Sequence, residues 1–194
     1  MILTSSNISQ INRQVPNLAR GQVQKLFAPA FQKLKNKMIA EFLNHPVTLE
    51  IKGGTSSSNI SGTLGGATNL FSFIGFESGS DPTDAIEKIL SSTNFRFTRT
   101  TRNSVEFEID MPEAAEIFAA TPMPWAPGRS WAKGIETGIS GLGYYLKISK
   151  DSSRSGLGIQ SPRKVRKSGS KFKNTQYISA LIKKYQKEFA NLQL

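Results

Sequence analysis

Six large apolar side chains near the start of the chain recur at spacings of three and four residues, and they are Val23, Phe27, Phe31, Leu34, Met38 and Phe42. This spacing places all six on one face of an α-helix. Pro29 interrupts the pattern, and we expect it either to kink the helix or to open its longer second half, because proline is tolerated in a first turn and not in a helix interior. Asn44, His45 and Pro46 end the helix.

A second apolar stripe lies in the last segment of the chain, residues 174–194. Its members share one helical face, and they are Ile178, Leu181, Ile182, Tyr185, Phe189 and Leu192. Three lysines occupy the remaining surface: Lys183, Lys184 and Lys187. The pattern predicts an amphipathic terminal helix whose apolar face packs either on the protein's own sheet or on a neighbouring subunit.

The segments between these helices carry weaker signals. Residues 47–51 alternate apolar and polar side chains, and residues 69–76 resume an apolar run after a Gly- and Ser-rich loop over residues 53–66, so both runs are predicted to be strands. The remaining elements are predicted in chain order as a helix over 83–90 opened by Asp81 and Pro82, a helix over 112–120, an extended connection over 121–128, a helical turn over 131–135 capped by Ser130, and a strand over 144–148.

Two further runs, around Phe97 and around Phe107, alternate apolar and polar residues in the manner of half-buried strands. We predict that they form a hairpin. A loop of three residues sets Phe97 opposite Phe107 and Arg96 opposite Glu108, which keeps the apolar side chains on one face.

The length and the composition limit the chain to one modest core, because only 38% of its 194 residues are apolar. We expect an α+β fold, in which a small antiparallel sheet is packed by an N-terminal and a C-terminal amphipathic helix and carries extended arms and loops. The expected organisation is an N-terminal arm (1–20), the α+β core (21–148), a basic arm (149–173) and the C-terminal helix (174–194).

The net charge of +11 is unevenly spread along the chain. Residues 147–173 carry nine basic and one acidic side chain, whereas residues 45–146 carry seven basic and eleven acidic ones. The basic arm is therefore expected to contact phosphates or an acidic protein surface, and its alternative interpretation is a solvated tail. The candidate contact residues are Arg154, Arg163, Lys164, Arg166, Lys167, Lys171 and Lys173. Phe172 is the one aromatic residue of the arm, which disfavours binding of single strands by base stacking.

Four aromatic residues are candidate interface anchors. Trp125 and Trp131 flank a short loop that contains Arg129, and this composition is typical either of a buried contact with a partner or of a lid over the protein's own core. Tyr185 and Phe189 are the corresponding candidates on the terminal helix.

The sequence offers no residues for a recognisable catalytic or metal site. The chain has no cysteine, which excludes disulfides, thiolate zinc sites and cysteine nucleophiles. The single histidine, His45, is expected to cap a helix or to lie on the surface. Glu106, Glu108 and Asp110 are expected on the solvent face of a strand and not around a metal. We therefore predict a non-enzymatic protein without cofactors, and neither a secretion signal nor a membrane span is indicated.

Four phrases of the sequence are similar to segments of small virion proteins of long-tailed phages, encoded with the neck and tail top. They are Phe118-Ala-Ala-Thr-Pro-Met-Pro-Trp-Ala-Pro-Gly-Arg-Ser-Trp131, Gly138-Ile-Ser-Gly-Leu-Gly143, Ser153-Arg-Ser-Gly156 and Asn174-Thr-Gln-Tyr-Ile-Ser-Ala-Leu181. The long terminal helix departs from the family's general order of elements.

The resemblance implies a neck, head–tail connector or tail-completion protein of the virion, found in the host cytoplasm during assembly. It implies a ring of identical subunits around the DNA channel and contacts with neighbouring virion proteins such as a connector, a tail terminator or a tail tube. The alternative is a basic nucleic-acid-binding protein that is not part of the virion.

Overall fold

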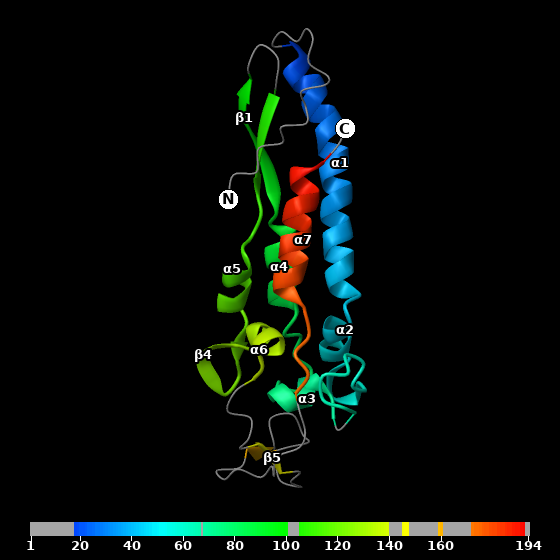
Figure 1. Cartoon of the computed structure of the whole chain (residues 1–194), viewed down its shortest axis with the longest axis vertical. Coiled ribbons are helices and arrows are strands. Elements are labelled where there is room, and N and C mark those ends of the chain that lie inside the picture. Colours follow the sequence, from blue (N-terminus) through cyan, green and yellow to red (C-terminus); the bar gives the residue numbers. More distant parts are fainter. Residues whose placement is uncertain are drawn as a thin grey trace.

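Helix α1 (Leu18–Leu43) runs along most of the molecule's length in the computed structural model (Figure 1). The structure describes residues 18–66, 68–100, 105–139, 145–147, 159–160 and 172–192. The other elements are α2 (Pro46–Lys52), a 3₁₀ turn (Gly54–Ser56), α3 (Leu70–Ile74), α4 (Asp84–Ser91), β1 (Asn94–Thr100), β2 (Val105–Asp110), α5 (Ala114–Ala119), β3 (Pro122–Met123), β4 (Ala126–Ser130), α6 (Trp131–Thr137), β5 (Tyr145–Lys147), β6 (Ile159–Gln160) and α7 (Ile178–Ala190).

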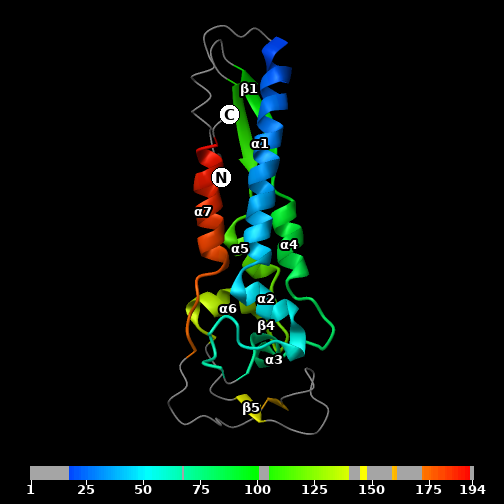
Figure 2. The same cartoon turned by 90° about the vertical axis from the view of Figure 1, so that its right-hand side faces the viewer.

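The expected α+β class is confirmed, and the core lies where the two amphipathic helices meet the hairpin. The six apolar residues of the first stripe are all buried. Phe27 stacks on Phe107 of β2 with ring centroids 4.4 Å apart, and Phe31 lies 5.3 Å from Phe189 of α7. Figure 2 shows α1 in front with α7 and α4 on either side, and α1 contacts both of these helices.

Helix α1 continues through Pro29, so this proline does not open a separate helix. Pro29 lies on the exposed side of α1. Lys25, whose carbonyl group loses its N–H donor to the proline ring, is exposed as well, so water reaches this side of the helix.

The predicted strand over residues 47–51 is wrong, because this segment forms α2. Pro46 occupies the first turn, and the Nδ1 atom of His45 accepts a hydrogen bond of 3.3 Å from the backbone N–H of Val47. Val47 and Ile51 are buried and Leu49 is exposed. Positions i and i+4 share one face in a helix and also in a strand, so Val47 and Ile51 do not distinguish the two structures. The cap from His45 and the proline in the first turn favour the helix.

The second predicted strand, over residues 69–76, is wrong for a related reason. Asn69 caps α3 by accepting a hydrogen bond of 2.9 Å from the backbone N–H of Ser72. Gly75 ends the helix in the left-handed conformation, with φ at 84°. All five residues of α3 are buried, so no polar–apolar alternation distinguishes the two structures here.

The hairpin of β1 and β2 has the predicted pairing, with Phe97 opposite Phe107 and Arg96 opposite Glu108. Arg96 and Glu108 also form an ion pair of 2.7 Å. Between Phe97 and Arg99 the register shifts by one residue, so that Thr100 pairs with Val105. Four residues therefore separate the strands, and the predicted three-residue loop is wrong because this irregularity takes up the difference.

A buried carboxylate organises the loop that follows α2. Glu50 is fully buried, and its oxygens accept hydrogen bonds from the backbone N–H groups of Leu70 at 2.7 Å and Ser61 at 2.8 Å. The side-chain amide of Asn59 donates to it as well, at 2.9 Å. These hydrogen bonds to Glu50 order the loop, whose small residues do not order it by packing.

The shorter elements follow the prediction more closely. Helices α4 and α5 lie within the predicted segments to within a residue or two, and Ser130 caps α6 by accepting a hydrogen bond of 3.0 Å from the backbone N–H of Lys133. The proline-rich connection over 121–128 includes a small antiparallel pair, β3 with β4. Among the described residues, no helix has the length and apolar character needed to cross a membrane.

Candidate functional site

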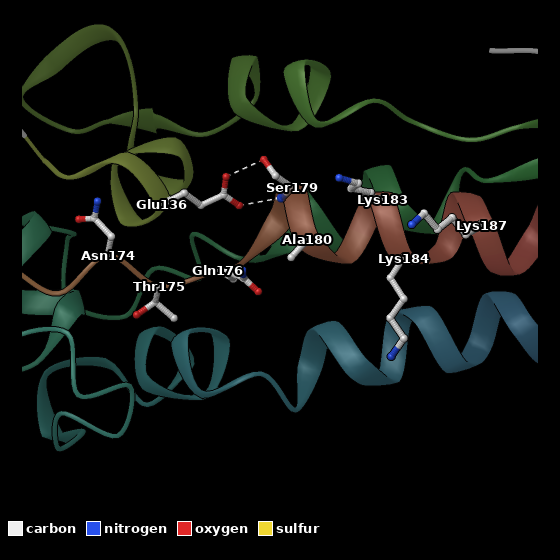
Figure 3. Close-up of a pocket in the computed structure, with 9 residues that line it drawn as sticks. All are labelled: Glu136, Asn174, Thr175, Gln176, Ser179, Ala180, Lys183, Lys184 and Lys187. Atoms are coloured by element: carbon white, nitrogen blue, oxygen red, sulfur yellow. Dashed lines mark hydrogen bonds between the residues drawn. The ribbon is translucent and has the colours of Figure 1, made fainter.

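A surface groove of about 520 Å³ runs along the amino-terminal half of α7 (Figure 3). It lies between that helix, the segment 174–176 that leads into it, and Glu136 at the end of α6. Three lysines line it from α7: Lys183, Lys184 and Lys187. The groove is therefore basic along the helix and polar at its far end.

Glu136 fixes the start of α7 from another element. The backbone N–H and the hydroxyl of Ser179 each donate a hydrogen bond of 2.6 Å to a different oxygen of this carboxylate. The backbone N–H of Thr175 donates to the carbonyl of Ile135 at 3.1 Å. Because free N–H groups and the helix dipole make a helix start positive, the negative charge of Glu136 is partly compensated there.

Lys184 is held by a carboxylate of α1. Its ammonium group lies 2.6 Å and 2.8 Å from the two oxygens of Glu41, and the hydroxyl of Tyr185 donates to the same carboxylate at 2.7 Å. Burial raises the pKa of Glu41, but the hydrogen bonds from Lys184 and Tyr185 outweigh it and hold the pKa below its usual value. The hydrogen bonds of Glu41 with Lys184 and Tyr185 join α1 to α7.

Lys183 and Lys187 are the two lysines of the groove that remain available. Both are exposed, and they have no ion-pair partner in the part of the chain that the structure describes. Lys184 points toward α1, whereas Lys183 and Lys187 lie along the outer side of α7 (Figure 3). They are four residues apart, so they follow one another on the same side of the helix.

The basic arm joins the rest of the structure at one end of the molecule. Strand β5, which precedes the arm, lies beyond α3 and α6 at that end in both views (Figures 1 and 2). At the other limit of the arm, Phe172 stacks on Phe73 of α3 with centroids 6.1 Å apart. The backbone N–H of Lys173 donates to the carbonyl of Thr63 at 2.9 Å. Both flanks of the arm thus lie at the same end of the molecule.

Most of the candidate phosphate-contact residues lie outside the described residues: Arg154, Arg163, Lys164, Arg166, Lys167 and Lys171. Lys173 is described, and its side chain is exposed. Lys183, the first lysine of the groove, lies ten positions further along the chain.

The structure places the two tryptophans over the protein's own core. Trp131 is buried and packs edge-on against Phe76 with centroids 5.6 Å apart. Trp125 is half-buried, and its indole N–H donates to the carbonyl of Ile74 at 2.8 Å. Of the two interpretations of this pair, the lid over the core matches these contacts.

The other two expected interface anchors are also covered by the chain itself. Tyr185 and Phe189 are fully buried between α7 and α1. The apolar face of the terminal helix therefore packs on its own subunit, and the side of α7 that faces outward is the one with Lys183 and Lys187.

The remaining candidates have the contacts expected of structural groups. His45 caps a helix, which is one of its two expected roles, but this helix is α2, which was not predicted. Glu108 pairs with Arg96. No cluster of three or more potential metal ligands occurs among residues 18–66, 68–100, 105–139 and 172–192.

The groove was not predicted from the sequence. The spacing of Lys183 and Lys187 indicates only that both lie on the polar side of α7. Glu136 lies 43 residues before Ser179, and nothing in the local sequence indicates that the two meet.

Comparisons of the chain with protein families, with curated proteins and with solved structures found no match.

Proposed function

We propose that the chain is a non-enzymatic structural subunit of a tailed-phage virion at the neck or tail top. In this proposal it is a head–tail connector, neck or tail-completion protein, it assembles as a ring, and it contacts neighbouring virion proteins. The basic arm faces DNA or an acidic neighbour.

The observation that carries the proposal is the attachment of the basic arm at one end of an elongated subunit (Figure 1). The contacts of Phe172 and Lys173 hold one flank there, and β5, which precedes the arm, lies at the same end. In the proposed assembly the arm is tethered at that end through its two flanks, and the long sides of the subunit pack against other proteins. This suits a protein that joins stacked parts of a particle around a DNA channel.

The use of charged side chains in the described part of the chain supports a structural role. Glu41, Glu50 and Glu136 each accept hydrogen bonds that join separate elements. His45 accepts one that begins a helix. Carboxylates and imidazoles are also the groups that acid–base mechanisms use, and these four are engaged in holding the fold.

The proposal is tested in the phage that encodes the chain, by removing the gene and supplying it from a plasmid. We expect separate heads and tails in electron micrographs without the plasmid, joined particles with it, and the protein in purified particles by mass spectrometry. Intact infectious particles that form without the protein would contradict the proposal and favour the non-virion nucleic-acid-binding protein.

Replacement of Arg163, Lys164, Arg166 and Lys167 by glutamine tests the arm itself. We expect this variant to fold and to join few heads to tails. The matched control replaces four exposed or half-exposed lysines elsewhere, Lys25, Lys33, Lys35 and Lys133, and removes the same charge. Equal loss of joined particles in both variants would show that net charge, and not the position of the arm, is what matters.

A further inference from the structure

Two hollows follow one another along α7. The groove described above ends at Lys187, and the same residue lines a second hollow of about 370 Å³. The second hollow is also lined by Leu34 of α1 and by Leu192, which lies just after α7. The surface therefore changes from basic to partly apolar in the direction of the chain's end.

Lys183 and Lys187 give the first hollow a positive charge that the described chain leaves unpaired. Lys184 does not add to it, because Glu41 binds its ammonium group at 2.6 Å. Glu136 does not cancel it fully, because its single carboxylate lines the groove with the ammonium groups of both Lys183 and Lys187. At the far edge Glu188 is paired with Lys37 at 2.8 Å.

We propose that this surface binds an extended acidic segment of a neighbouring protein chain, with two carboxylates on Lys183 and Lys187 and an apolar side chain in the hollow beside Leu34 and Leu192. The identity of the neighbour as a virion protein rests on the proposed function, whereas the binding chemistry does not.

The spacing of the groups fits an extended peptide. Side chains four residues apart on a helix are about 6 Å apart. In an extended strand, every second side chain points the same way, at intervals of about 6.6 Å. Carboxylates at positions i and i+2 of the ligand therefore reach Lys183 and Lys187, and position i+4 or i−2 reaches the hollow next to Asn191.

The groove fits a peptide better than a nucleic acid. Its two available lysines lie in a concavity that also contains the Glu136 carboxylate, whereas a duplex backbone needs a broad surface with many cations. Asn174 and Gln176 at its end carry amide groups, which both donate to and accept from a peptide backbone. The apolar hollow has no counterpart in a phosphate backbone.

The test uses the full chain labelled with ¹⁵N and two end-blocked peptides, Glu-Ser-Glu-Ser-Leu and its reverse. We expect one of them to shift the amide resonances of Ser179, Lys183 and Lys187 in a saturable way at low salt. The matched peptides with Gln in place of Glu should not do so. A short duplex DNA is the third probe, to separate carboxylate from phosphate recognition.

Two variants locate the binding. Replacement of Lys183 and Lys187 by glutamine should weaken peptide binding by about tenfold. Replacement of the exposed lysines Lys25 and Lys33 of α1 removes the same charge and should weaken it by about twofold or less. A third variant, Leu192→Ser, should weaken the binding of the leucine-containing peptide. It should leave unchanged the binding of a peptide that has serine in place of this leucine.

Three results would overturn the proposal: equal loss in the two lysine variants, peptide-induced shifts outside the groove, or shifts of the groove amides by DNA but not by the peptides. None of these would decide whether the protein belongs to a virion, because the gene-removal experiment tests that separately. Conversely, peptide binding at the groove would stand even if particles formed without the protein.

Discussion

The backbone N–H of Leu70 donates a hydrogen bond of 2.7 Å to the fully buried carboxylate of Glu50. The two residues lie at the start of α3 and near the end of α2, so this contact closes the loop between them. The loop's other polar groups, in Asn59 and Ser61, converge on the same carboxylate.

Removal of this carboxylate should destabilise the fold. Glu50→Ala leaves two backbone N–H groups and an amide without their acceptor, at about 1–3 kcal/mol for each buried donor that water does not reach. We expect a clear fall in the midpoint of urea unfolding. Glu77→Ala removes an exposed carboxylate and serves as the control. A variant at position 50 as stable as the control would show that water replaces the lost acceptor.

The packing of α7 on α1 gives a second prediction. Phe189 is fully buried against Phe31, so Phe189→Ala should cost about 3–5 kcal/mol of unfolding free energy. Tyr185→Phe keeps the ring and loses only the hydrogen bond to Glu41, so its cost should be about 1 kcal/mol. Chemical denaturation of both variants measures the difference. Similar losses would mean that α7 does not depend on its apolar face.

The burial of Tyr185 and Phe189 makes them unsuitable positions for testing particle assembly. An aspartate at either position puts a charge into the core, and the resulting loss of joined particles would report unfolding. Lys183 and Lys187 are the positions on α7 at which a substitution tests assembly without disturbing the core.

The stability of the protein should fall as the pH decreases through the titration range of histidine. Burial lowers the pKa of His45 from its ordinary value of 6.5. The unfolded chain therefore binds this proton more readily than the folded one, so His45 supports the fold above pH 6.5 and opposes it increasingly below. The neutral ring also keeps Nδ1 free to accept from Val47.

Urea unfolding at pH 7 and at pH 5 measures this effect. His45→Asn provides the control, since asparagine also caps helices and does not titrate. The variant should lose the His45 contribution, and its stability should change less between the two pH values. An equal change in both proteins would assign the pH dependence to the carboxylates.

Two glycines should respond to alanine in opposite directions. Gly21 lies in α1 with open space around it, so Gly21→Ala should stabilise the protein by about 0.5–1 kcal/mol. Gly75 has a φ of 84°, so Gly75→Ala should destabilise it by about 1–2 kcal/mol. Thermal unfolding distinguishes the two signs. A stabilising Gly75→Ala would mean that α3 ends in another conformation.

The long elements were predictable because their side-chain periodicity extends over several turns. The stripe from Val23 to Phe42 and the one from Ile178 to Phe189 each allow only one structure. The hairpin was predictable from the alternation of apolar and polar residues in both strands, and its structure pairs Phe97 with Phe107 as expected. In each case the residues that determine which side chains are buried lie close together in the sequence.

The sequence failed to predict structure where the apolar pattern was short, or where two contacting residues lie far apart in the chain. Residues 47–51 and 69–76 are too short to separate a period of two from one of 3.6, and the deciding caps come from His45 and Asn69. The groove depends on Glu136 and Ser179, which only the tertiary fold brings together. Exposed lysines look alike in a sequence, whether they line a groove or face open water.

The attachment of the basic arm at one end has a consequence for how the subunit approaches a partner. The arm carries eight basic and one acidic side chain, and both of its flanks lie near α3. An anionic partner bound by the arm is therefore tethered to the α3 end of the subunit, and the charge of the arm attracts such a partner before contact. Salt shortens the range of this attraction, so the rate of docking, and not only its strength, depends on ionic strength.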